Sequence, residues 1–211
     1  ILNKKLVERY SRQIVLKDVG PTGQKKIINS KVLVVGAGGL GCPVIDYLSR
    51  AGVGNIGVVD NDKVNISNIH RQSLYNSKDV GKFKVNVVKQ KIKLINPKVN
   101  IKTFRVRIEK KNIEKIFKNY HFIIDGSDNF KTKFLLNEYS LKYKKVLIVG
   151  AISKMDGHIF TFNFKNKKNT CLKCFYQSEP SDEILNCEYE GILGPVAGIV
   201  GNIQAVEVLK E

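Results

Sequence analysis

The feature that most constrains this chain is a glycine-rich turn directly after a short apolar run. Val32–Val35 is continuously apolar, and residues 36–41 then read Gly-Ala-Gly-Gly-Leu-Gly. A strand that ends in such a turn and opens a helix binds phosphate, because glycines let the backbone approach an anion and the helix N-terminus presents free N–H groups. Gly36, Gly38 and Gly41 therefore predict a nucleotide site at the start of a βαβ unit.

Short apolar runs and amphipathic segments alternate along the rest of the chain. We expect strands at 31–35, 55–59, 99–106, 121–124 and 146–149, and helices at 40–50, 77–95, 112–119 and 130–141. The helix after the turn should bury Leu40, Val44, Tyr47, Leu48 and Ala51. Alternation of this kind predicts a Rossmann-like α/β fold, with a doubly wound, mostly parallel sheet and helices on both faces.

The two ends of the chain depart from this alternation. Residues 4–29 have a helical pattern with a Gly-Pro-Thr-Gly break at 20–23. Residues 157–164 alternate aromatic and polar side chains, which is typical of an antiparallel strand, and Gly194-Pro195 opens a last helix to about Leu209. We expect one domain over residues 1–211, with a small antiparallel, loop-rich C-terminal part.

The net charge of +17 raises the question of nucleic acid. Thirty of the 36 basic residues are lysines spread along the chain, without an arginine–aromatic cluster. Such a surface gives only salt-sensitive, non-specific binding, so we do not expect a nucleic-acid partner. No apolar stretch approaches the roughly 20 residues that span a membrane, and the polar N-terminus is not a signal peptide. We therefore expect no membrane association and a cytoplasmic location.

A carboxylate follows the second strand of the βαβ unit. Asp60 lies roughly 20 residues beyond the turn, where an acidic side chain usually bonds the ribose hydroxyls of a nucleotide. NAD-binding and ATP-binding sites share this pair of features. The turn and Asp60 alone therefore do not exclude an NAD-dependent dehydrogenase.

Charged residues farther along point to a triphosphate. Asn68 and Arg71 share a face, and arginine can grip a phosphate with two parallel hydrogen bonds. Lys84 lies in the first turn of a helix, and Asp128 follows a strand at the edge where open α/β sheets bind ligands. Asp128 is suited to hold Mg²⁺ and equally suited to cap the next helix. Together these residues favour ATP over a nicotinamide.

The cysteines allow several interpretations. Cys171-x-x-Cys174 is half of a tetrahedral zinc site, or a cytosolic pair without metal. Cys42, beside the glycine turn, is expected to be a buried small side chain. Cys187 lies in a polar segment, either as a reactive thiol or without a chemical role. Arg12 is either a solvated helix charge or a group that reaches a nucleotide in another subunit.

The chain resembles the ubiquitin-activating-enzyme-like adenylyltransferases, specifically the bacterial ThiF/MoeB type. The matching segments span nearly the whole chain in the expected order. They are Arg9–Ile14, Gly36–Gly41, Gly52–Gly54, Asp60-x-Asp62-x-Val64, Ser67–Gln72, Gly81-Lys-x-Lys84, Asp128-Asn129, Cys171-x-x-Cys174 and Gly194-Pro195.

The resemblance implies an activity. ATP and Mg²⁺ would activate the C-terminal glycine carboxylate of a small ubiquitin-like sulfur-carrier protein, giving an acyl-adenylate and pyrophosphate, for thiamin or molybdopterin sulfur transfer. It also implies a homodimer in which Arg12 enters the partner subunit's site. A tRNA-modifying relative and a non-catalytic scaffold subunit are the alternatives within the family.

The resemblance also implies residue roles. Gly39 and its neighbours would cradle the nucleotide, Asp60 would bind the ribose, and Asp128 would hold Mg²⁺. The nucleotide-binding set implied in this way is Gly36, Gly38, Gly39, Gly41, Asp60, Asp62, Asn68, Arg71, Gln72, Lys84, Asp128 and Asn129. Arg12, Arg71, Lys84 and Asp128 would be catalytic, and Cys187 would take part in sulfur handling.

The zinc motif departs from the family pattern, which uses two CxxC pairs where this chain has Cys171 and Cys174 alone. We expect a chain that is shortened at its C-terminus, with Zn²⁺ bound in the full-length protein.

Overall fold

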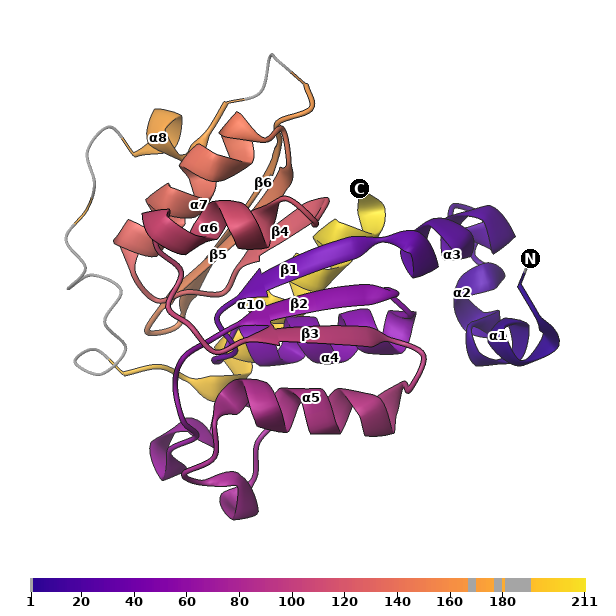
Figure 1. Cartoon of the computed structure of the whole chain (residues 1–211), viewed down its shortest axis with the longest axis horizontal. Helices are drawn as coiled ribbons and strands as arrows, with labels where there is room; N and C mark the ends of the chain where they lie inside the picture. Colours follow the sequence, from indigo (N-terminus) through magenta and orange to yellow (C-terminus); the bar gives the residue numbers. More distant parts are fainter. Residues whose placement is uncertain (1, 167–169, 177–179, 181–190) are drawn as a thin grey trace.

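One sheet organises the molecule, for which a computed structural model describes residues 2–166, 170–176, 180 and 191–211. Its strand order is β3-β2-β1-β4-β5-β6, as Figure 1 shows. The strands are β1 (Lys31–Val35), β2 (Asn55–Val59), β3 (Asn100–Phe104), β4 (Phe122–Asp125), β5 (Val146–Ser153) and β6 (Asp156–Asn163). The first five run parallel, and β6 pairs antiparallel with β5. The Rossmann-like α/β prediction is confirmed, and so is the antiparallel strand near the C-terminus.

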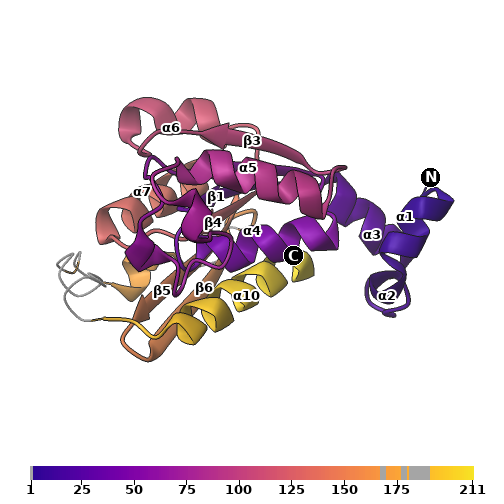
Figure 2. The same ribbon diagram turned by 90° about the horizontal axis from the view of Figure 1, so that it is seen from below.

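Helices cover both faces because the strands are apolar on both sides. Val32 and Val34 of β1 pack with α4 (Gly41–Ala51), α5 (Lys84–Ile95) and α10 (Gly194–Lys210). Leu33 and Val35 point to the opposite face, toward α6 (Lys110–Phe117), α7 (Phe130–Lys142) and α8 (Leu172–Phe175). Successive strand residues alternate between faces, so a continuous apolar run is buried twice. Figure 2 shows α4, α5 and α10 together on one side of the sheet.

Strand order places the candidate site. The chain leaves β1 toward β2 on one side and later returns to place β4 on the other. Between the carboxyl ends of β1 and β4 the connections diverge, and open α/β sheets bind ligands in that crevice. The glycine-rich turn follows β1 and therefore lies at this edge.

The N-terminal segment differs from its prediction. It forms α1 (Lys4–Arg9), α2 (Ser11–Ile14) and α3 (Gly20–Asn29), so the breaks fall at Tyr10 and at 15–19, and not at 20–23. Pro21 lies in the first turn of α3, where proline loses no helical hydrogen bond. The three helices lie at the end of the sheet where the strands begin (Figure 1).

Two helix predictions are corrected in detail. Tyr47 of α4 is 53% exposed and does not join the core. The segment predicted as one helix from residue 77 is a short 3₁₀ turn at Ser77–Asp79, and the helix begins only at Lys84. Gly81 separates the two with a φ of 83°, a left-handed conformation that a helix cannot contain.

No helix in the described ranges is both long and apolar enough to cross a membrane.

Candidate functional site

A cavity of about 540 Å³ lies at the carboxyl ends of β1, β2 and β4. Every predicted nucleotide-binding residue except Gly41 lines it. The lining combines the glycine turn, the Asp60–Asp62 segment, the short helical turn η1 (Ile66–Asn68) with Arg71 and Gln72, the start of α5, and the loop from Gly126 to Asn129. The structure therefore brings together predicted residues that are up to 93 positions apart in the chain, Gly36 and Asn129.

Glycines of the turn serve two different needs. Gly36 has a φ of 92°, and a Cβ there would lie 2.6 Å from the carbonyl oxygen of Gly126. Gly41 is outside the cavity lining, and its missing side chain lets α4 start against the carbonyl of Gly36. A Cβ on Gly38 would meet only Gln72 Nε2, at 3.7 Å. Nothing in the surrounding chain demands glycine at 38, and its bare backbone leaves room for a ligand to approach.

Asp60 is tied to the turn. Its Oδ2 accepts from the Ala37 amide at 2.8 Å and its Oδ1 from the Asp62 amide at 2.8 Å. The carbonyl of the same residue, Ala37, accepts a hydrogen bond from the hydroxyl of Tyr75 at 2.8 Å. Burial raises the pKa of Asp60 above its ordinary value, although the charge of Lys84 and the two amides lower it in part. The carboxylate thus fixes the glycine turn and also faces the cavity.

Lys84 is anchored by Asp62. Its Nζ lies 3.0 Å from Asp62 Oδ2, and its amide donates to the Asp62 carbonyl at 3.0 Å. The side chain of Lys84 is 7% exposed, whereas that of Asp62 is 59% exposed. Within the described part of the chain, this carboxylate is the one hydrogen-bond partner of the ammonium. Since an ammonium has three donors, two are left to meet a ligand in the cavity.

The segment after η1 supplies a second cation. Arg71 Nη1 donates to the Ser67 carbonyl at 2.8 Å and lies 2.9 Å from His70 Nε2. Asn68 accepts from the Asn65 amide at 3.1 Å, which fixes the turn that carries Arg71. Gln72 is 3% exposed, and its Oε1 has no partner among the described residues. A buried polar atom of this kind on a cavity wall is satisfied when a ligand or water fills the cavity.

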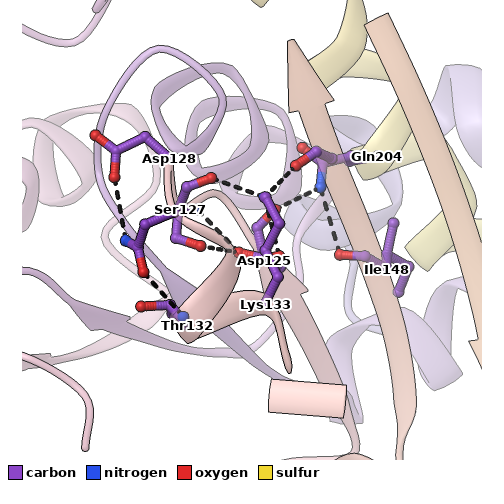
Figure 3. Close-up of polar contacts among 9 residues, drawn as sticks. Asp125, Ser127, Asp128, Thr132, Lys133, Ile148 and Gln204 are labelled. Atoms are coloured by element: carbon purple, nitrogen blue, oxygen red, sulfur yellow. Dashed lines mark hydrogen bonds and ion pairs between the residues drawn. The ribbon is translucent and has the colours of Figure 1, made fainter. Parts of the chain in front are cut away.

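The acidic loop after β4 places Asp128 at the cavity. Asn129 caps α7, because its Oδ1 accepts from the Thr132 amide at 2.9 Å. The alternative that Asp128 is the cap is therefore wrong. Asp128 is exposed, and its carboxylate accepts a hydrogen bond from the side-chain amide of Asn129 at 3.3 Å (Figure 3). Its charge is available to a ligand.

Sequence reasoning missed two lining residues with full charges, Arg107 and Lys133. Arg107 follows β3 with Val106 and Ile108, which add apolar surface to the cavity lining. Lys133 lies in the second turn of α7, 1% exposed, and forms an ion pair with Asp125 at 3.1 Å. Arg107 stood out as one of only six arginines, whereas nothing distinguished Lys133 from the other lysines.

Other predicted residues lie away from the cavity. Arg12 of α2 is exposed, and neighbouring Gln13 donates to the carbonyl of Ala51, at the far end of α4 from the turn. Cys42 is buried as expected, and burial raises the pKa of its thiol to about 12. Cys187 lies outside the described residues. Arg12 therefore lies too far from the cavity of its own chain to act there, and it could act only at the cavity of a second copy of the chain.

Cys171 and Cys174 lie side by side on the opposite face from α4. Their Sγ atoms are 3.6 Å apart, and Asn137 of α7 anchors the turn by accepting from the Leu172 amide at 2.9 Å. Burial raises the pKa of the Cys171 thiol, but hydrogen bonds with Cys174, Asn137 and the backbone of Lys173 together outweigh it and leave that pKa lowered. No group of three or more metal-binding side chains occurs in the part of the chain that the structure describes. The pair provides two of the four ligands that structural zinc takes.

The profile of the ThiF family matches residues 10–211. The chain is 42% identical over 205 residues to the adenylyltransferase and sulfurtransferase UBA4 of Vanderwaltozyma polyspora, covering 96% of this chain and 47% of that protein. It is 40% identical to the probable molybdopterin-synthase adenylyltransferase of Gracilaria tenuistipitata, covering 96% and 57%. It is 38% identical to the sulfur carrier protein adenylyltransferase of Thermus thermophilus, covering 98% and 78%.

A crystal structure of Escherichia coli MccB with MccA-N7isoASN has the same fold, with a TM-score of 0.85 at 24% identity over 99% of this chain and 64% of that chain. The chain spans about half the length of the first two relatives, 47% and 57%.

Proposed function

The chain belongs to the ThiF family, and we propose that it adenylylates the C-terminal glycine of a small ubiquitin-like sulfur-carrier protein with ATP. An oxygen of the glycine carboxylate forms a bond to the α-phosphorus. The bond between the α-phosphorus and the bridging oxygen breaks, and pyrophosphate leaves with the electron pair. The product is an acyl-adenylate. The names of the relatives from Gracilaria tenuistipitata and Thermus thermophilus support this choice.

The observation that carries the proposal is that two cations and an exposed carboxylate line the same cavity. Lys84 and Arg71 are the cations, with donors to spare on Lys84, and Asp128 is the carboxylate. A triphosphate needs cations along its length, and a metal-bound triphosphate needs a carboxylate as well. A nicotinamide needs neither. The cavity therefore fits ATP better than NAD.

In this proposal the chain works by positioning and charge neutralisation. Gly38 and Gly39 let the turn approach the phosphates, and Asp60 accepts from the ribose hydroxyls. Lys84 and Arg71 neutralise the negative charge that builds up on the leaving pyrophosphate. Asn68 holds the turn of Arg71, and Gln72 presents its buried amide to the same ligand.

Asp128, with Asn129 beside it, is the group proposed to hold Mg²⁺. A lone carboxylate fits this ion, which commonly takes one or two protein carboxylates and completes its shell with phosphate oxygens and waters. When bound, the ion would polarise the phosphate oxygens as a Lewis acid. Asp128 itself contributes the charge and the fixed position of one ligand.

Pyrophosphate exchange separates this proposal from the dehydrogenase alternative. The protein is incubated with ATP, labelled pyrophosphate and a candidate carrier that ends in glycine. We expect label in ATP only when the carrier and Mg²⁺ are both present. A matched carrier that lacks its terminal glycine is the control. Binding of NAD without any carrier-dependent exchange would sink the proposal. Exchange that requires a tRNA and not the carrier would favour the tRNA-modifying relative.

We further propose a homodimer in which Arg12 completes the partner subunit's site. Its position beyond the far end of α4 supports this, because it cannot serve the cavity of its own chain. Arg12→Ala and Arg71→Ala proteins should each be inactive alone. Mixed dimers should regain one of their two sites, because one site then carries both intact arginines. No recovery on mixing would count against a shared site, once subunit exchange has been verified by native mass spectrometry.

Several finer points belong to the same proposal. The carrier would serve thiamin or molybdopterin sulfur transfer in the cytoplasm, and Cys187 would handle sulfur. Cys171 and Cys174 would bind Zn²⁺ together with two ligands outside residues 1–211 of a longer chain. A single domain over these residues also stays a prediction.

A further inference from the structure

A buried ion pair lies directly beneath the acidic loop of the cavity. Lys133 Nζ is 3.1 Å from Asp125 Oδ2, and the two side chains are 2% and 0% exposed. The same ammonium donates to the carbonyl of Ser127 at 2.8 Å and to that of Gly150 at 2.6 Å. Figure 3 shows Lys133 beside Asp125 and Ser127, with dashed lines that join the three residues. A charge buried this deeply is costly unless each of its donors finds an acceptor.

The three acceptors account for all the donors of Lys133. An ammonium has three N–H groups, and here they meet Asp125, Ser127 and Gly150. Lys133 therefore has no donor left for a phosphate, although it lines the cavity. In this it differs from Lys84, whose ammonium has one partner within the described ranges. The role of Lys133 therefore follows from the loop that its three hydrogen bonds hold in place.

Lys133 holds the loop that carries Asp128. Asp125 Oδ1 accepts from the amide of Ser127 at 2.9 Å and from its hydroxyl at 2.5 Å, so Ser127 is bound on one side by Asp125 and on the other by Lys133. Gln204 of α10 donates to the carbonyl of Asp125 at 2.9 Å. Asp128 directly follows Ser127, and Asn129 after it is fixed as the cap of α7.

Both neighbours of Asp128 are thus fixed, and its carboxylate lies on the cavity wall without a cation of its own chain beside it among the described contacts. We infer that Lys133 is a positioning residue, which holds the Ser127–Asp128 peptide so that the carboxylate of Asp128 meets the metal ion on the triphosphate. This rests on the proposed function. The linked carbonyl of Gly150, on β5, sets the loop against the neighbouring strand.

The test measures metal binding directly. Mn²⁺ replaces Mg²⁺, and electron paramagnetic resonance records the free ion in the presence of protein and a non-hydrolysable ATP analogue. Lys133→Met should weaken Mn²⁺ binding about 10–100-fold, the range for residues that orient a metal ligand without binding the ion themselves. Binding of the analogue without metal should change little. Asp128→Asn should weaken Mn²⁺ binding at least as much, and Lys131→Met, an exposed position on the same helix, should match the wild type.

Lys133→Met also leaves Asp125 as an unpaired buried charge, so a second variant separates folding from positioning. Asp125→Asn combined with Lys133→Met removes both charges and should restore thermal stability, while Ser127 and Gly150 still lack their donor. Mn²⁺ binding should stay weak in this double variant. Lys133→Arg keeps the charge and its donors, and should bind Mn²⁺ more tightly than the Met variant.

The outcomes are distinguishable. Wild-type Mn²⁺ binding in Lys133→Met, or full recovery in the double variant, would overturn the positioning role and leave the proposed function standing. Absence of analogue-dependent Mn²⁺ binding in the wild type itself, together with absence of carrier-dependent exchange, would overturn the proposed function and with it this inference.

Discussion

The carboxyl ends of β2 and β4 are built from the same parts with opposite results. An aspartate that binds backbone amides directly follows β2 (Asp60) or is the last residue of β4 (Asp125). A second aspartate follows two or three residues later, Asp62 or Asp128. A lysine from a later helix pairs with one of the two aspartates, Lys84 of α5 after β2 and Lys133 of α7 after β4. The two ends differ in which aspartate the lysine meets.

At β2, Lys84 pairs with the second, exposed acid, Asp62. At β4, Lys133 pairs with the first, buried acid, Asp125, and the exposed Asp128 has no lysine partner among the residues that the structure describes. The β2 end therefore presents a cation with donors to spare, and the β4 end presents an anion. The comparison shows how one arrangement of residues yields the two kinds of group that a metal-bound triphosphate requires.

The largest effect is expected at the anionic end. Asp128→Ala should reduce carrier-dependent pyrophosphate exchange by at least about 10²–10³-fold, the range seen when one preorganised charge or donor is removed. The fold should stay intact, because Asp128 is exposed and Asn129 caps the helix. Circular dichroism provides the control for folding. Near-wild-type exchange would refute the role of Asp128.

At the cationic end, Lys84→Met should lower exchange by about 100-fold, because it removes donors from the phosphate side of the cavity. Asp62→Asn should have a much smaller effect, since it loosens the ammonium without removing it. Steady-state kinetics of both variants measure this order. An Asp62→Asn protein more impaired than Lys84→Met would mean that the carboxylate, and not the ammonium, meets the ligand.

For stability, the larger effect is again expected at the β4 end. Lys133→Met should cost about 3–5 kcal/mol in the free energy of unfolding, because it leaves a buried carboxylate unpaired. Lys84→Met should cost less, because its partner Asp62 is 59% exposed and stays solvated. Urea unfolding of the two variants gives the comparison. Equal losses would show that the exposure of the partner does not matter.

The smallest effect concerns pH. Because burial raises the pKa of Asp60, the folded chain holds a proton that the unfolded chain has already released. Between the ordinary and the raised pKa, this group therefore lowers the free energy of unfolding as the pH rises. Asp60→Asn should remove that contribution, so the variant gains stability relative to the wild type across this window. Urea unfolding of the wild type and the variant across this window measures the difference, and a difference that does not change with pH would contradict it.

The difference between the two ends also marks what sequence can predict. Lys84 could be predicted because it follows a motif and opens a helix. Lys133 could not, because its three acceptors come from β4, from the loop after it and from β5, and only the folded sheet brings them together. Asp128 was correctly placed at the strand end, but only the structure shows that Asn129 is the cap.

The periodicity of apolar residues predicted the central fold, but it was less reliable where tertiary packing determines whether a side chain is buried or where a helix begins. The βαβ unit at 31–59 follows from two apolar runs around the glycine turn, and its strand limits were correct. Tyr47 shares the helical spacing of its apolar neighbours, yet it lies at the edge of that face and stays exposed. The apolar pattern of residues 4–29 likewise did not reveal the break at 15–19, since Gly20 and Pro21 drew attention to the wrong place.

Mass spectrometry of the carrier protein tests the central claim most directly. The protein is incubated with ATP, Mg²⁺, pyrophosphatase and a carrier that ends in glycine. The account predicts a carrier heavier by one adenylyl group, attached at the terminal glycine, and no such product with Asp128→Ala. An unmodified carrier, under conditions where the wild-type protein is folded and binds ATP, would contradict it.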